Sequence, residues 1–138
     1  TANTTMKLIM FTDGGSRINP GTAATGIVIK TESGKILAAY GEYIGIQTNN
    51  TAEYAAVISA LKKARELGAD TVECYMDSLL VVEQMNRRWK VKEPHLQKLF
   101  VQTWNAAAQF KKVTFRHVRR EKNKEADAEV NKALDERR

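Results

Sequence analysis

Met6-Lys7-Leu8-Ile9-Met10-Phe11-Thr12-Asp13-Gly14-Gly15 is the stretch that decides the fold. It begins as a mostly apolar run of strand length and ends in an aspartate followed by two glycines. Such a run predicts a strand buried on both faces, near the middle of a sheet. A carboxylate at the end of a buried strand is costly unless a cation pairs with it. Alone, the stretch fits a simple Asp-Gly turn equally well.

Strands and helices are predicted along the rest of the chain from its apolar spacing. The predicted strands span 22–31, 35–44, 71–76 and 113–118, and the predicted helices span 51–67, 77–85, 94–110 and 125–135. The helix at 51–67 has an inner face predicted from Ala55, Ile58, Leu61 and Ala64. A strand, a helix and a strand in succession imply a crossover, so the strand at 71–76 should run parallel to the first.

The expected fold is therefore α/β, with a five-stranded mixed sheet flanked by helices. Three strands form an antiparallel meander and two more are parallel. The polar residues 1–6 lack a strand or helix pattern and are expected to be a loose N-terminal end. Residues 7–136 are expected to form a single domain.

Composition and charge narrow the class of protein. The chain has 138 residues, a net charge of +6 and one cysteine, Cys74. Residues 1–80 carry seven Lys/Arg and eight Asp/Glu, whereas residues 81–138 carry fifteen and eight. A basic C-terminal half indicates a polyanionic partner, or simply a well-solvated surface. No secretory leader or membrane span is evident, so we expect a reduced, cytoplasmic monomer.

Four acidic residues occupy related places in the predicted fold. Asp13 and Asp77 end two strands that should be parallel neighbours. Glu53 and Asp127 lie in the first turns of two helices, where the helix dipole alone would favour an acid. At a separation of 4 Å, each like-charged pair costs about 4 kcal/mol at an effective dielectric constant of 20. Cations would cancel this cost, and carboxylates without His or Cys suit Mg²⁺ or Mn²⁺. Two such ions can clamp a phosphodiester.

Four sequence blocks resemble ribonuclease H type 1. They are Phe11–Gly21 (FTDGGSRINPG), Thr48–Glu53 (TNNTAE), Met76–Ser78 (MDS) and Arg119–Asp127 (RREKNKEAD). Their order and spacing fit this family along nearly the whole chain, and residues 76–92 are similar to the ribonuclease H domains of actinobacteria. The resemblance implies a ribonuclease H-like fold and two Mg²⁺ ions, with Mn²⁺ as a substitute. It implies cleavage of the RNA strand of an RNA/DNA hybrid, leaving 5′-phosphate and 3′-hydroxyl ends.

The resemblance also implies roles for individual residues. Catalytic and metal-binding roles fall on Asp13, Glu53, Asp77 and Asp127, with Gly14 as a further metal contact. Glu53 would also contact the RNA 2′-hydroxyl. Substrate contacts fall on Asn19, Thr48, Asn49, Asn50, Arg88, Trp89, Lys90, Arg119 and Asn123. Asn19, Asn49 and Asn50 would read the minor groove, where an amide can both donate and accept. Thr48 would bind a DNA phosphate, and Asn123 would lie near the scissile phosphate.

The chain departs from many relatives in three ways. The Lys- and Trp-rich helix and loop that grips substrate is absent, so Arg87, Arg88, Trp89 and Lys90 would have to serve. Trp89 would stack on a DNA sugar or merely cover the sheet edge. Leu79 stands where some relatives have a polar contact residue.

The third departure concerns a mobile loop histidine. His117 lies ten residues before Asp127, but its spacing from Val118 and Asn123 predicts a strand residue. Arg119 or Arg120 would then take over part of the loop's role. His95 is expected to be a surface residue at a helix start.

Two other functions remain open. One is a catalytically silent nucleic-acid-binding module of the same fold, although such modules usually lose a carboxylate and all four are present here. The other is a nuclease that also acts on double-stranded RNA, since residues that read 2′-hydroxyls do not exclude RNA on both strands.

Overall fold

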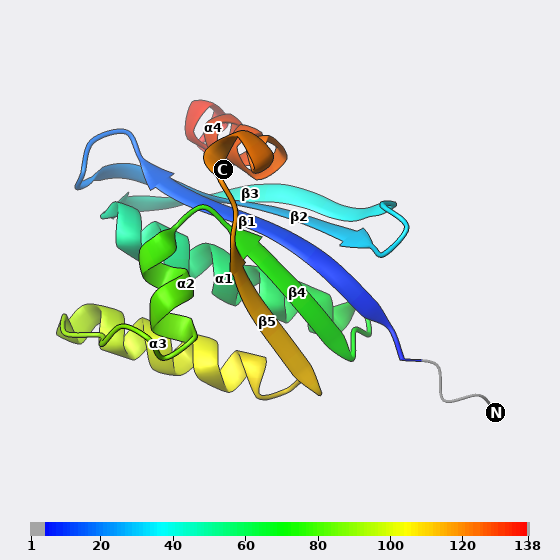
Figure 1. Ribbon diagram of the computed structural model, residues 1–138. Coiled ribbons are helices and arrows are strands. Elements are labelled where there is room, and N and C mark those ends of the chain that lie inside the picture. Colours follow the sequence, from blue (N-terminus) through cyan, green and yellow to red (C-terminus); the bar gives the residue numbers. More distant parts are fainter. Residues whose placement is uncertain (1–4, 138) are drawn as a thin grey trace.

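A five-stranded mixed sheet forms the centre of the protein, as the sequence predicts (Figure 1). The computed structural model describes residues 5–137. The sheet order is β3-β2-β1-β4-β5. Its strands are β1 (Lys7–Ser16), β2 (Gly21–Thr31), β3 (Ile36–Gln47), β4 (Thr71–Met76) and β5 (Lys112–His117). Strands β1, β2 and β3 are antiparallel, whereas β4 runs parallel to both β1 and β5.

Helices cover the two faces of the sheet unequally. The helices are α1 (Asn49–Glu66), α2 (Leu79–Met85), α3 (Pro94–Ala107) and α4 (Lys124–Glu136), and a 3₁₀ turn spans Arg120–Lys122. Figure 1 shows α1, α2 and α3 on one face and α4 alone on the other. Helix α4 packs on β1, β2 and β3. In the part of the chain that the structure describes, no helix is both long and apolar enough to cross a bilayer.

The prediction that β1 is buried on both faces is wrong for its first half. Leu8, Met10 and Thr12 are fully buried, whereas Ile9 and Phe11 on the other face keep part of their surface exposed. The reason is that α4 covers only the part of that face nearest the end of β1. Phe11 stacks instead on Tyr75 of β4 across the open part of the sheet.

The main core lies between the sheet and α1, α2 and α3. The predicted inner face of α1 is confirmed in part, because Leu61 and Ala64 are buried whereas Ala55 and Ile58 keep part of their surface exposed. Tyr54 is buried as well, and its hydroxyl is satisfied inside the core, where it donates a hydrogen bond to Gln84 Oε1 (2.5 Å). The buried face therefore includes a hydrogen-bonded aromatic that the apolar spacing did not predict.

Close approach of α4 to the sheet depends on two glycines. A Cβ built on Gly26 would lie 2.1 Å from the carbonyl oxygen of Ala126, and one built on Gly41 would lie 2.5 Å from that of Glu129. Since real Cβ contacts are never this short, only glycine lets the helix settle on β2 and β3. This settling places the start of α4 beside the end of β1.

Only the last two residues of the expected loose end, residues 1–6, belong to the part of the chain that the structure describes. Residues 1–4 lie outside the described residues. Met6 hydrogen-bonds through its backbone to Asp70, donating to the Oδ2 atom (2.7 Å) and accepting from the backbone N–H (2.8 Å). These bonds join the start of β1 to the turn before β4.

Candidate functional site

Three carboxylates converge at one edge of the sheet. Thr12 of β1 pairs with Met76, the last residue of β4, so Asp13 and Asp77 lie side by side where the parallel pairing ends. The prediction that Asp13 ends its strand is wrong, because β1 continues to Ser16 in its pairing with β2. Glu53 reaches the same place from α1. One oxygen of each carboxylate lies within 4.8 Å of the other two. The structure therefore brings together acids that are 40 and 24 residues apart in the chain.

Gly14 links two of these carboxylates. Its backbone N–H lies 3.0 Å from Asp13 Oδ1 and 2.9 Å from Glu53 Oε1, and it donates to both. A Cβ at this position would lie 2.2 Å from the backbone of Ala52. The absent side chain thus allows α1 to approach β1 closely enough for Glu53 to enter the cluster.

The cluster is electrostatically uncompensated. Burial, and then the charges of Asp77 and Asp127, raises the pKa of Asp13 to about 8. Burial and the neighbouring Asp13 raise the pKa of Glu53 well above its ordinary value. The pKa of Asp77 is raised by burial, against the opposing charge of Arg120. Divalent cations would remove this repulsion, and oxygen-only donors fit Mg²⁺ or Mn²⁺.

Asp127 lies near the three carboxylates without joining their tight group. It is in the first turn of α4, as predicted. It lines the same cavity of about 400 Å³, here called the carboxylate cavity, together with Asp13, Glu53 and Asp77. Asn131, one turn further along α4, donates to Asp127 Oδ2 (3.3 Å). The fourth acid is therefore positioned on the α4 side of the cavity.

Asn19 and Asn49 are brought together beside this cavity. The backbone N–H of Asn49 donates to Asn19 Oδ1 (3.0 Å), and Asn49 Oδ1 accepts from the backbone N–H of Ser16 (2.8 Å). Asn50 is exposed in the first turn of α1. These bonds fix the loop after β1 against the start of α1. Thr48 caps α1, because its Oγ1 accepts from the backbone N–H of Thr51 (3.2 Å).

Asn123 is buried beside the carboxylate cluster. Only 1% of its surface is exposed, and its Nδ2 donates to the backbone oxygen of Thr12 (2.8 Å). Its side chain also interacts with Asp77, where it opposes the rise in the pKa of that carboxyl. These contacts join the start of α4 to the acid-bearing strand ends, and the predicted place of Asn123 near the scissile phosphate stays a prediction.

The predicted basic grip lies outside the carboxylate cavity. Arg88 and Lys90 are exposed, and Trp89 keeps 47% of its surface exposed. Arg88 is already engaged, because its Nη2 donates to Glu83 Oε1 (3.0 Å) and its Nε to the other carboxylate oxygen. Arg119 is exposed and precedes the 3₁₀ turn.

Arg120 is the cation that lines the carboxylate cavity from the loop before α4. Its Nε lies 4.0 Å from Asp77 Oδ2. Sequence reasoning left Arg119 and Arg120 as equal candidates, because nothing in the local pattern shows which side chain turns inward. The structure places Arg120 there.

The histidines lie where the sequence predicts. His117 is the last residue of β5, paired with Met76, which confirms the prediction of a strand residue. His95 is exposed in the first turn of α3. Leu79, 44% exposed, begins α2.

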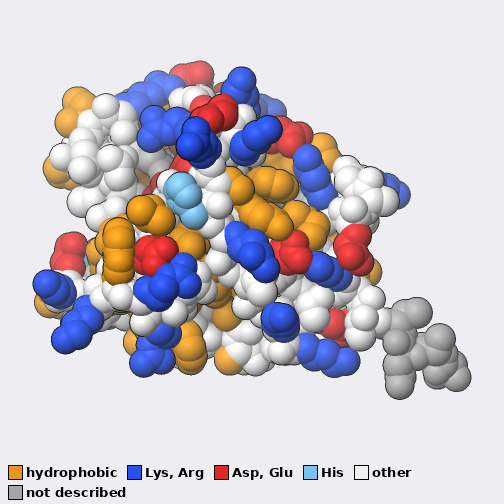
Figure 2. Space-filling view, in the orientation of Figure 1, with side chains coloured by type: hydrophobic (Ala, Val, Ile, Leu, Met, Phe, Trp, Pro, Cys, Tyr) orange, Lys and Arg blue, Asp and Glu red, His pale blue; other side chains and the backbone are white. Residues whose placement is uncertain are grey.

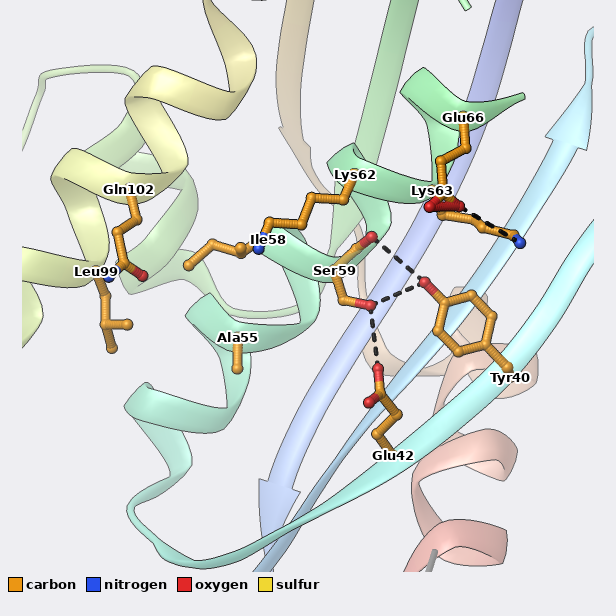
Figure 3. Close-up of a pocket in the computed structure, with 10 residues that line it drawn as sticks. All are labelled: Tyr40, Glu42, Ala55, Ile58, Ser59, Lys62, Lys63, Glu66, Leu99 and Gln102. Carbon is orange, nitrogen blue, oxygen red and sulfur yellow. Dashed lines mark hydrogen bonds and ion pairs between the residues drawn. The ribbon is translucent and has the colours of Figure 1, made fainter. Parts of the chain in front are cut away.

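A separate cavity of about 500 Å³ lies between β3, α1 and α3 (Figure 3). Five of the polar side chains that line it contact one another. Tyr40 and Ser59 share a hydroxyl–hydroxyl bond (2.8 Å), Ser59 donates to Glu42 (3.4 Å) and Lys63 pairs with Glu66 (3.7 Å). We therefore assign no chemistry to it.

Comparison with known proteins gives one consistent family. Residues 11–133 match a family described as "Reverse transcriptase-like". The bifunctional protein Rv2228c of Mycobacterium tuberculosis is 47% identical over 131 residues, which are 94% of this chain. The chain spans only 36% of the length of that relative.

Solved structures agree with the sequence matches. The N-terminal ribonuclease H domain of Rv2228c is 45% identical with a TM-score of 0.93, and the match covers 96% of both chains. RNase H1 of Halobacterium salinarum is 40% identical with a TM-score of 0.92, over 94% of this chain and 98% of that one. LC11-RNase H1, in complex with an RNA/DNA hybrid, is 43% identical with a TM-score of 0.90, also over 94% and 98%.

Proposed function

This chain belongs to the ribonuclease H type 1 family, and from that premise we propose that it hydrolyses the RNA strand of RNA/DNA hybrids. The products would carry 5′-phosphate and 3′-hydroxyl ends. The observation that carries the proposal is the cluster of Asp13, Glu53 and Asp77 within 4.8 Å, with raised pKa values. A protein has no structural reason to gather acids in this way unless cations bind them.

Asp13, Glu53 and Asp77 would hold the metal ions, with Asp127 as the fourth acid. Two Mg²⁺ ions, with Mn²⁺ as a substitute, suit a set of oxygen donors. When bound, such ions supply charge neutralisation at the phosphate and an activated water. The raised pKa of Asp13 means that metal binding must release a proton at neutral pH.

The protein's own side chains would orient the hybrid across this site. Asn19, Asn49 and Asn50 present amides that suit the 2′-hydroxyls and base edges of the minor groove. The Arg120 guanidinium, beside Asp77, can donate two hydrogen bonds to a phosphate. Trp89 offers an exposed ring for contact with a sugar. We propose that the protein works as a monomer.

Two observations bear on the alternatives. A silent binding module would not need acids held at raised pKa values, and all four acids line one cavity here. Cleavage of double-stranded RNA depends on how the minor groove is read on both strands, so it is an outcome of the experiment below.

The test is incubation with labelled RNA/DNA hybrid, double-stranded RNA and double-stranded DNA, each with and without Mg²⁺. We expect cleavage of the hybrid only with Mg²⁺ or Mn²⁺. Asp13→Asn should lower the cleavage rate by more than about 100-fold, because even residues that merely support a metal ligand cost 10–100-fold. Hybrid binding should survive this change. Cleavage by the wild-type protein in EDTA, or by Asp13→Asn at the wild-type rate, would contradict the proposal.

A further inference from the structure

We propose that the surface around Arg87 and Trp104 is a second binding site for nucleic acid, which holds a backbone phosphate of the hybrid outside the carboxylate cavity. This inference rests on the proposed function, because the ligand is a more distant part of the same substrate. It separates Arg87 from the rest of the predicted grip and joins it to Trp104, Lys111 and Lys112, which the predicted grip does not include.

A basic and aromatic cavity of about 460 Å³ lies at this surface. It opens between the end of α2, the C-terminal half of α3 and β5. Arg87, Lys111 and Lys112 line it together with Trp104 and Phe110, and none of its lining residues is Asp or Glu. Figure 2 shows Lys and Arg side chains, together with acidic ones, around hydrophobic side chains at the lower left, where Figure 1 places α2 and α3. Three cations without an acid are complementary to phosphates.

The backbone at Arg87 points to a function for its side chain. Arg87 directly follows the C-cap of α2 and has a φ of 64°, in the left-handed region. Its N–H bonds to Gln84 O (3.0 Å) and the next N–H bonds to Glu83 O (2.9 Å). This is the helix ending in which glycine is the favoured residue. An arginine here adopts a backbone conformation that glycine would adopt without strain.

Trp104 holds the Arg87 side chain in place. The guanidinium carbon lies 5.5 Å from the centre of the indole ring, which is 44% exposed and stacks on Phe100. A guanidinium stacked on an aromatic ring keeps its N–H groups free for a phosphate. Less conformational entropy is then lost when a ligand binds.

The charges of this cavity are not engaged within the protein. Between residues 5 and 137, no ion pair includes Arg87, Lys111 or Lys112. Arg88, by contrast, is held by the two hydrogen bonds that it donates to Glu83. The structure therefore favours Arg87 over its neighbour as the available cation.

The cavity is continuous with the predicted grip and within reach of a bound hybrid. Arg87 also lines a neighbouring cavity with Trp89 and Lys90. From His117, beside the carboxylate edge, β5 runs back to Lys112, which is about 17 Å at 3.3 Å per residue. That span corresponds to about five nucleotides at 3.4 Å each. A hybrid of 20 base pairs centred on the carboxylates is therefore long enough to reach the cavity around Arg87 and Lys112.

The decisive variant is Arg87→Gly, because its expected effects on stability and on hybrid binding have opposite signs. Glycine should raise the melting temperature by relieving the left-handed backbone. It should also weaken binding of a labelled 20-base-pair hybrid in EDTA about threefold to tenfold. The slope of log affinity against log salt should fall by about one for the single lost phosphate contact. The double variant Lys111→Ala/Lys112→Ala should lower the slope by up to about two.

Lys35→Ala is the matched control, since Lys35 is an exposed lysine at the turn between β2 and β3, away from α3. Its affinity and salt slope should equal those of the wild type. Hybrid affinity and slope unchanged in both Arg87→Gly and Lys111→Ala/Lys112→Ala would overturn the inference. Wild-type protein that binds hybrid but never cleaves it would instead refute the proposed function, so the two failures are distinguishable.

Discussion

At the scale of single residues, Asp13 shows how the fold changes the chemistry of a side chain. In a peptide it would be ionised at neutral pH, but burial and two neighbouring acids raise its pKa to about 8. Gly14 offsets part of this effect through the N–H that it donates to the carboxylate. The metal-free protein therefore holds a proton in the cluster near pH 7.

The stability of the metal-free protein should fall as the pH rises. Because the pKa of Asp13 is about 8 when folded and near 3.8 when unfolded, the folded state binds more protons between these values. Stability is then highest at the acidic end of this window, and the slope can reach about 1.4 kcal/mol per pH unit for one proton. Urea unfolding in EDTA at pH values from 5 to 8 measures this slope of the unfolding free energy against pH. Asp13→Asn should flatten the slope, and an identical slope in that variant would contradict the assignment.

Arg120→Ala should slow hybrid cleavage and move its pH dependence upward. Arg120 opposes the rise in the pKa of Asp77, so its loss should raise that pKa further. We expect roughly a tenfold lower rate, less than for a buried donor because this side chain is largely exposed. The measurement is a pH–rate profile at fixed Mg²⁺. Lys122→Ala, an exposed lysine in the same turn, should leave the profile unchanged.

At the scale of elements, the residue at which α1 begins determines whether the helix dipole can explain an acid at position 53. The sequence predicts a helix from residue 51, which would place Glu53 in its first turn. The observed helix begins at Asn49 because Thr48 caps it, so no acid lies in the first turn. The helix dipole therefore offers less of a structural explanation for Glu53. Its place in the carboxylate cluster becomes the better one.

Gly14→Ala should disrupt the junction between β1 and α1. A methyl group would lie 2.2 Å from the backbone of Ala52, so the helix must shift and take Glu53 with it. Overpacking of this kind costs about 1–3 kcal/mol. Chemical denaturation should show that loss, together with weaker Mg²⁺ binding. Gly15→Ala is the control, because its Cβ would meet only Asn49 Oδ1 at 3.9 Å. Equal stability of the two variants would contradict this packing argument.

At the scale of the whole molecule, an acidic centre lies within a basic protein. The net charge is +6, yet the carboxylate cavity gathers four acids. Such a distribution suits a polyanion held by the surroundings while cations bind at the centre. Of the surrounding cations, Arg120 enters the cavity and Arg87 faces a second one.

Mg²⁺ should therefore stabilise the folded protein. Metal that binds only the folded state adds about 2.7 kcal/mol at a concentration 100 times its Kd. Thermal unfolding with increasing MgCl₂ should show a rising Tm, with KCl of equal ionic strength as the control. The Asp77→Asn variant should lose most of this rise. A Tm that responds equally to both salts would show that the cluster binds no specific cation.

The strands, the mixed sheet and the neighbouring positions of Asp13 and Asp77 could be predicted from the sequence, because apolar spacing and the right-handed crossover are local or topological rules. Packing decided the rest. The half-open face of β1 depends on how far α4 extends, and Tyr54 enters the core of α1 with its hydroxyl bonded to Gln84, a partner far away in the sequence.

The same division holds at the site. The four acids could be named from their positions in the chain, whereas only the folded protein shows which of two adjacent arginines lies beside a carboxylate or an aromatic ring, at residues 87–88 and 119–120. Neighbouring arginines are chemically identical in a sequence. They differ only once a carboxylate, an aromatic ring or a left-handed backbone residue lies beside one of them.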